Sequence, residues 1–251
     1  NVCNYLNSCL NSIVMIEKIN LNNILFLDIE TVPEAEDFNS LDSEMKELWE
    51  HKTQYQRKDE FTAKDFYDRA GIWAEFGKIV CISVGYFTIK GDIRNFRVTS
   101  FFGEEKKLLL DFNNLLNNHF NQPQHVLCGH NAKEFDIPFL ARRMIINQIV
   151  IPSKLNLFGK KPWEIPHLDT LELWKFGDYK HYTSLKLLTK ILGIPSPKGD
   201  IDGSQVGQVF YVENDIDRII TYCEKDTIAV AQIFLRLRRE DLLTEEEIFH
   251  V

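Results

Sequence analysis

Residues 24–31 read Ile-Leu-Phe-Leu-Asp-Ile-Glu-Thr, an apolar run that ends in two carboxylates one residue apart. A run this continuous is typical of a strand in the interior of a sheet. Side chains alternate between the faces of a strand, so Asp28 and Glu30 point the same way and raise the cost of ionising each other. A divalent cation such as Mg²⁺ or Mn²⁺, which prefers oxygen ligands, would remove that cost. Two solvated acids where a strand runs into a loop are the plainer alternative, and for an isolated pair the better one.

The rest of the sequence predicts one α/β domain, a mixed sheet flanked by helices, within a chain of 251 residues. We place the domain at residues 21–240, after an N-terminal extension (1–20) and before an acidic, dispensable C-terminal tail (241–251). A helical insertion of about residues 34–77 interrupts it. The expected strands, besides the first, are 78–87, 93–102 and 125–128. The expected helices are 41–56, 62–70, 104–120, 135–149, 167–176, 184–192 and 215–239.

Charge and cysteine content narrow the functional class. The net charge of −8 argues against a protein that coats nucleic acid through bulk electrostatics, although acids that bind metal contribute to that total. The 5 cysteines form no C-x-x-C pair, which disfavours a zinc site and fits a reducing cytoplasm.

The first fourteen residues are rich in Asn and Ser and carry no positive charge. They make a poor signal peptide and are too short and polar to span a membrane. Two interpretations stay open: the native chain starts at Met15 and residues 1–14 are an appendage, or these residues are a native extension.

Two further groups of polar residues stand beside predicted elements. Gly129-His130-Asn131-Ala132-Lys133-Glu134-Phe135-Asp136 follows the fourth strand and opens a helix, where backbone N–H groups favour an anionic ligand. A simple helix cap is the alternative. Tyr222 and Asp226 lie four residues apart on the face of the last long helix that also carries apolar residues, so both point inward. A buried aspartate without a cation nearby is costly, whereas aimed at Asp28 and Glu30 it would complete a metal site.

In this order, D-x-E, N-x-x-x-F-D and Y-x-x-x-D resemble the motifs of the DEDD exonuclease superfamily in its tyrosine-bearing branch, DEDDy. The second motif is closest to the proofreading domain of family B DNA polymerases, and residues 184–193, 202–204 and 222–236 resemble stand-alone bacterial exonucleases related to it. The resemblance covers roughly residues 20–240. It departs from the polymerase domains in the acidic insertion and in having no polymerase attached.

The resemblance implies an RNase H-like fold and 3′–5′ hydrolysis of nucleic acid to nucleoside 5′-monophosphates. A recessed site favours single strands, and of DNA and RNA, which the sequence leaves open, we favour DNA as the substrate. It implies two divalent cations, Mg²⁺ or Mn²⁺, held by Asp28, Glu30, Asp136 and Asp226. Tyr222 would orient the attacking water. The implied contacts to the terminal nucleotide are Thr31, His130, Asn131 and Phe135.

Other features carry competing interpretations. His167 and Asp169 are a candidate ligand pair, or the cap of the helix that follows them. Lysines and aromatic residues alternate over 152–200 and suggest a path for a single strand, or solvated helix faces. A catalytically silent nucleic-acid-binding module and a subunit that docks a polymerase or helicase remain alternatives. We expect single-stranded nucleic acid as partner, and a replication or repair protein as a second one.

Overall fold

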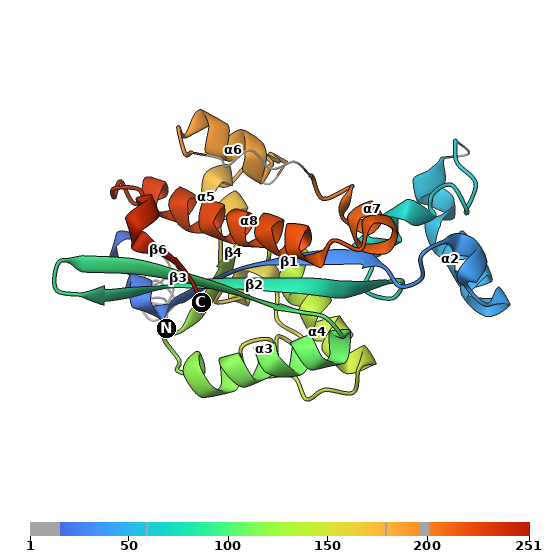
Figure 1. Cartoon of the computed structure of the whole chain (residues 1–251), viewed down its shortest axis with the longest axis horizontal. Coiled ribbons are helices and arrows are strands. Elements are labelled where there is room, and N and C mark those ends of the chain that lie inside the picture. Colours follow the sequence, from blue (N-terminus) through green and yellow to red (C-terminus); the bar gives the residue numbers. More distant parts are fainter. Residues whose placement is uncertain (1–15, 59, 179, 196–200) are drawn as a thin grey trace, which may run out of the picture.

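The strands described in the computed structural model of the chain form one six-stranded mixed sheet (Figure 1). The structure describes residues 16–58, 60–178, 180–195 and 201–251. Across the sheet the order is β5-β4-β1-β2-β3-β6, so the strand rich in apolar residues is central, as predicted. The strands are β1 Ile24–Pro33, β2 Gly77–Lys90, β3 Ile93–Phe102, β4 Val126–Gly129, β5 Leu168–Asp169 and β6 Ile248–His250. β2 runs antiparallel to its neighbours β1 and β3, whereas β4 is parallel to β1 and β6 is parallel to β3.

Helices cover both faces of the sheet, which confirms the α/β class (Figure 1). The long helix α8 crosses one face over β1 and β2, while α3 and α4 pack on the other. The helices on the α8 side are α5 Thr170–Lys175, α6 Leu185–Ile191, α7 Val206–Gln208 and α8 Ile216–Leu237. The helices on the other side are α3 Glu105–His119 and α4 Asp136–Ile146.

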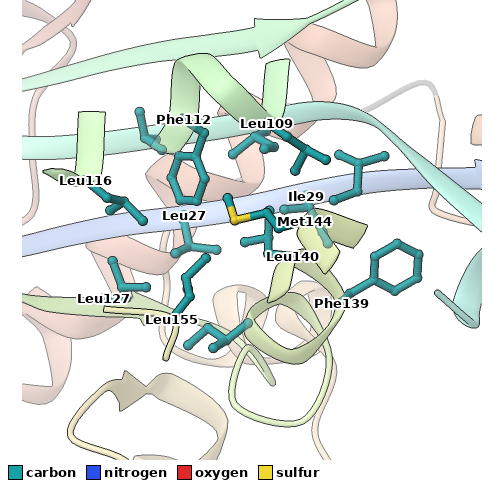
Figure 2. Packing of buried hydrophobic residues seen from close by; sticks show 14 of the residues in the cluster. Leu27, Ile29, Leu109, Phe112, Leu116, Leu127, Phe139, Leu140, Met144 and Leu155 are labelled. Atoms are coloured by element: carbon teal, nitrogen blue, oxygen red, sulfur yellow. The ribbon is translucent and has the colours of Figure 1, made fainter. Parts of the chain in front are cut away.

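The alternation along β1 divides the core into two layers. Its odd residues, among them Leu27 and Ile29, pack with α3 and α4 around Phe112, Leu140 and Met144 (Figure 2). Its even residues face α8 instead: Ile24 and Phe26 join the cluster that contains Phe234. Asp28 and Glu30 continue this even series, so the fold directs both carboxylates into the interface with α8.

The insertion between β1 and β2 differs from its prediction. Helix α2 Ser43–Arg57 is present, but the predicted helix at 62–70 is a series of turns that leads into a 3₁₀ helix at Tyr67–Ile72. Its aromatic residues are drawn into a separate small core around the fully buried Trp49, whose indole donates to the Ala63 carbonyl at 2.7 Å. This packing prevails over the helical pattern of the segment.

The last residues of the chain also differ from the prediction of a dispensable acidic tail. β6 adds to the edge of the sheet with Phe96 opposite Ile248 and Val98 opposite His250. Arg94 donates to both carboxylate oxygens of Glu247, at 2.8 and 3.0 Å, and to the carbonyls of Asp241 and Leu242. Glu247, an acid of the predicted tail, therefore helps to hold the C-terminal segment against the sheet. Among the described residues, no helix is long and apolar enough to cross a membrane.

We expect Arg94→Ala to lower the free energy of unfolding by about 1–3 kcal/mol, because it leaves part-buried acceptors of a charged donor without a partner. Arg97→Ala is the matched control, since Arg97 lies on the same strand and is exposed; its effect should stay within about 0.5 kcal/mol. Urea unfolding followed by circular dichroism measures both. Equal effects of the two substitutions would show that the contacts of Arg94 with Asp241, Leu242 and Glu247 contribute nothing to stability.

Candidate metal and active site

Four carboxylates from three elements meet at the interface between the sheet and α8. Asp28 and Glu30 come from β1, Asp136 is the first residue of α4, and Asp226 lies in the middle of α8. Glu30 and Asp136 are only 7% and 4% exposed. The sequence motifs predicted this set, and the structure brings all four side chains close enough to repel one another.

Asp136 reaches the site because β4 is short. β4 pairs with β1 only as far as Cys128 opposite Phe26, which leaves that edge of β1 open beyond it. There the N–H of Ile29 donates to Oδ1 of Asp136 at 3.2 Å, so the carboxylate continues the ladder of the sheet. The chain turns at Gly129, where a Cβ would lie 3.2 Å from the Leu27 carbonyl oxygen and clash with the Ala132 side chain.

Burial raises the pKa of every acid in the set, and repulsion from other acids of the set adds to the rise for Asp28 and Glu30. Burial, and then repulsion from Glu30, Asp226 and Asp136, hold the pKa of Asp28 well above its ordinary value. Burial, and then Asp226, Cys81 and Asp136, do so for Glu30. Burial raises the pKa of Asp136 to about 7 and that of Asp226 to about 6, where a hydrogen bond from Tyr222 offsets part of the rise. A divalent cation would relieve this excess negative charge.

Asp28 and Glu30 place their oxygens as close together as a shared cation needs, whereas Asp136 and Asp226 are not part of this close group. One oxygen each of Asp28 and Glu30 and the sulfur of Cys223 all lie within 4.8 Å of one another. Burial raises the pKa of the Cys223 thiol, which donates to Oδ2 of Asp28 at 3.4 Å and so stays protonated. The hard carboxylate oxygens, rather than this thiol, therefore fit the metal. The motifs did not single out Cys223; its position three residues before Asp226 was the available signal.

Tyr222 lies one helical turn before Asp226. Burial and the neighbouring Asp226 carboxylate hold the pKa of its phenol well above the ordinary range. The hydroxyl therefore remains protonated at neutral pH and acts as a donor rather than as a base.

The predicted nucleotide contacts fall into two groups. Both ring nitrogens of His130 are bonded within the protein, Nδ1 to Thr170 Oγ1 at 2.9 Å and Nε2 to the Thr183 carbonyl at 2.8 Å. Thr31 Oγ1 likewise donates to the Gly71 carbonyl at 2.8 Å. These two side chains hold the walls of the site.

Asn131 and Phe135 are half-buried in the loop that precedes α4. Within the described parts of the chain, the Asn131 side chain makes no hydrogen bond, so its amide is available to a ligand. Phe135 packs on Phe139 with ring centroids 5.4 Å apart. All four contacts to the nucleotide remain predictions.

Asp169 organises this loop, a role that the sequence did not reveal. It is 2% exposed and caps α5, accepting from the N–H groups of Leu171 and Glu172, as one of the two interpretations predicted. The same carboxylate also accepts from the N–H groups of Asn131 and Lys133, at 3.0 Å each. With four backbone donors, three of them on Oδ1, Asp169 holds the loop and the start of α5 together. His167 is also engaged, accepting from the Leu127 N–H and bonding the Lys154 carbonyl at 2.7 Å.

A cavity of about 440 Å³ opens directly beside Tyr222 and Asp226. Its opposite wall is the start of α6 with Lys186 and the preceding Tyr182, and Lys225 lies on the α8 side. Of the basic residues in the expected path at 152–200, Lys186 is therefore next to the acids. Lys154 instead donates to the carbonyls of Gln122 and His125.

Residues 72–249 match the family model described as a predicted 3′-5′ exonuclease related to the exonuclease domain of PolB. The chain belongs to this family. The match confirms the resemblance inferred from the motifs, and with the mixed sheet it supports an RNase H-like exonuclease fold. It makes nuclease activity on nucleic acid the general function of the family. A comparison with curated proteins found no match.

The raised pKa values predict how the stability of the metal-free protein depends on pH. An acid whose pKa rises on folding stabilises the fold below its ordinary pKa, and this stabilisation is lost as pH rises through the folded value. Because the pKa of Asp136 is about 7, the melting temperature without metal should fall between about pH 6.5 and pH 8. The pKa of His167 is lowered from 6.5 to about 4, so His167 contributes only near the lower end of this window, where its protonation in the unfolded state opposes the fall.

Differential scanning fluorimetry in a chelator measures this slope, and Asp136→Asn is the control that should flatten it. Adding Mn²⁺ should raise the melting temperature more at the upper end of the window than at the lower end, because protons no longer compete for the site. A slope that is the same in Asp136→Asn would mean that Asp136 titrates outside this window.

Proposed function

We propose that the protein is a metal-dependent 3′–5′ exonuclease of the DEDDy type. In this proposal it removes nucleoside 5′-monophosphates from the 3′ end of single-stranded DNA, with Mg²⁺ or Mn²⁺ as cofactor. The observation that carries the proposal is the convergence of four carboxylates, two of them buried and two half-buried, and one protonated tyrosine at the end of β1. Burying so much negative charge destabilises the fold unless the site holds cations.

The four acids would hold the cations. Asp28, Glu30 and Asp226 would bind one ion, and Asp28 together with Asp136 the second. When bound, two divalent ions supply an activated water near neutral pH and charge relief on the leaving 3′ oxygen. The backbone of β1 fixes Asp28 and Glu30, and the Ile29 N–H fixes Asp136, so the acids are positioned before substrate arrives.

Tyr222 would position the attacking water. Its hydroxyl stays protonated, so it can donate to the water or to a phosphate oxygen but cannot remove a proton. Asn131 and Phe135, on the opposite wall, would contact the terminal nucleotide, as would Thr31 through its backbone. His130 would act mainly by holding that wall through its bonds to Thr170 and Thr183.

The cavity beside Tyr222 would receive the nucleotides next to the cleaved bond. Its volume of about 440 Å³ is of the order of one nucleotide, and Tyr182 is 67% exposed, which suits a face on which a base stacks. Lys186 and Lys225 would contact phosphates. A duplex presents its bases paired and stacked, so this arrangement favours single strands.

The first test compares Asp28→Asn with Tyr222→Phe on a single strand carrying a 5′ label. Asp28→Asn should abolish stepwise shortening and weaken Mn²⁺ binding, because a ligand is lost. It should also raise the melting temperature without metal, because one repelling charge is gone. Tyr222→Phe should keep metal binding and lose about 10²–10⁴-fold in rate, as expected for a positioning group.

Native protein that leaves the labelled strand intact with both Mg²⁺ and Mn²⁺ would falsify the enzyme proposal and favour a silent binding module. If Tyr222→Phe also loses Mn²⁺ binding, the role given to Tyr222 is wrong. Labelled RNA in the same assay decides the preference between DNA and RNA.

A second test addresses the cavity. Lys186→Glu should weaken single-strand binding, measured with Ca²⁺ to prevent cleavage. It should also reduce the slope of log affinity against log salt by about 0.7, the value for one phosphate contact. Lys190→Glu is the matched control, because Lys190 is exposed one turn further along α6 and does not line the cavity. Equal effects of the two reversals would place the strand elsewhere.

Cysteine usage fits the cytoplasm, and a role in DNA replication or repair would bring a protein partner. We keep the proposed domain of residues 21–240 and extend it to the C-terminal strand Ile248–His250, which pairs with β3.

A further inference from the structure

A second cavity, of about 400 Å³, lies along α4 on the side formed with the loop 151–165. Its walls are almost entirely apolar. From α4 come Ile137, Pro138, Ala141 and Ile145. From the loop come Ile151, Leu155, Leu157, Phe158 and Ile165. We call this cavity the α4 groove.

Part of the groove is anchored in the core and part is open to solvent. Ile137 and Leu155 are each 1% exposed and form its floor, whereas Ile145 is 51% and Phe158 73% exposed at its rim. Trp163, 77% exposed, lies on the same loop. Large exposed apolar groups gathered over a formed cavity are typical of a binding surface rather than of scattered surface residues.

The rim of the groove is basic. Lys133, Arg142 and Lys160 line it, and Lys161 follows directly, with its ammonium 5.3 Å from the Trp163 ring centroid. Lys133 is paired with Glu172 at 2.6 Å. Among the described residues, Arg142, Lys160 and Lys161 form no ion pair. The nearby Glu164 carboxylate accepts from the Lys161 backbone N–H instead. Unpaired cations therefore surround this apolar groove on a chain of net charge −8.

We propose that the α4 groove docks a partner protein through a short segment in which apolar side chains are flanked by aspartate or glutamate. Apolar side chains would fill the cavity, and the acids would pair with Arg142, Lys160 and Lys161. This goes beyond the exonuclease proposal and does not depend on it, because none of the four site carboxylates lines the groove.

The chemistry of the walls favours a peptide over a nucleic acid. A nucleobase in the groove would bury its polar edge against aliphatic side chains and leave its hydrogen-bonding groups without partners, which is costly. Leucine, isoleucine or phenylalanine side chains carry no such groups. The cavity beside Tyr222, by contrast, offers hydroxyls and lysines suited to a nucleotide.

The test selects peptides from a random library displayed on phage against the full chain, with a single-stranded oligonucleotide present as competitor. Enriched peptides are then made with a fluorescent label and titrated by anisotropy. We expect enriched sequences to combine apolar residues with acids. Their affinity should fall at least about tenfold in Ile145→Glu and in Arg142→Glu, and should fall as salt increases.

Two substitutions on α2 serve as matched controls. Leu48→Glu places the same charge at a side chain that is also 51% exposed, and Lys52→Glu reverses an exposed cation. Neither should change peptide affinity, and melting temperatures verify that all four variants fold.

Four results would overturn the proposal: no enriched peptide, enriched peptides without acids, peptides that bind Ile145→Glu as well as native protein, or a self-association that Ile145→Glu abolishes. A labelled oligonucleotide that loses affinity in Ile145→Glu would assign the groove to the nucleic acid instead. Hydrolysis by Ile145→Glu is measured in parallel, so failure of the docking proposal is distinguishable from failure of the exonuclease proposal.

Discussion

Repulsion among four carboxylates at one end of a buried strand is the constraint on which the site depends. β1 carries two of these acids into the interface with α8 because its even residues face that helix. α8 and the first residue of α4 bring the other two. Without metal, this arrangement lowers the stability of the fold, because ionised Asp28 and Glu30 are disfavoured by burial and repulsion. Their pKa values are accordingly held well above the ordinary range. The fold tolerates this cost because both layers of its core, above and below β1, are well packed and hold the backbone rigidly.

The structure supports that arrangement with groups that do no chemistry. Asp169 ties the loop before α4 to α5 through four N–H groups, and His130 bonds the same loop to the segments around Thr170 and Thr183. On the far side Thr31 bonds Gly71, which connects the end of β1 to the insertion. Each wall of the site therefore has its own brace. A displacement of any wall would shift one carboxylate relative to the others, so these braces help to hold the acids in place.

The sequence predicted the central strand, the helices that carry Asp136 and Asp226, and the four acids, because each follows from a short-range pattern. Alternation places Asp28 and Glu30 on one face, and a spacing of four places Tyr222 with Asp226. What it missed depends on contacts between distant residues. The segment 62–70 packs around Trp49, Glu247 binds Arg94, and Asp169 bonds a loop that lies far from it in the sequence. A local sequence pattern does not reveal a partner that is distant in the sequence. An acid that pairs with a strand, caps a helix or lies in an exposed tail therefore looks the same in the sequence.

The same reasoning separates the two cavities. The one beside Tyr222 combines a lysine on each side with an exposed aromatic ring and borders the acids, so an anionic, base-bearing ligand satisfies every wall of it. The α4 groove has an apolar interior and carries its cations at the rim, so it suits a ligand with apolar side chains inside the groove and carboxylates at its edge. Both would attract polyanions at long range, since charge acts over about a Debye length whatever carries it. Discrimination between a nucleic acid and an acidic peptide has to come from the interiors of the cavities. There, a buried polar edge of a base without a hydrogen-bond partner costs more free energy than an ion pair at the rim contributes. If both proposals hold, one small domain would bind a nucleic-acid strand and a protein partner at the same time, because the two cavities share no lining residue.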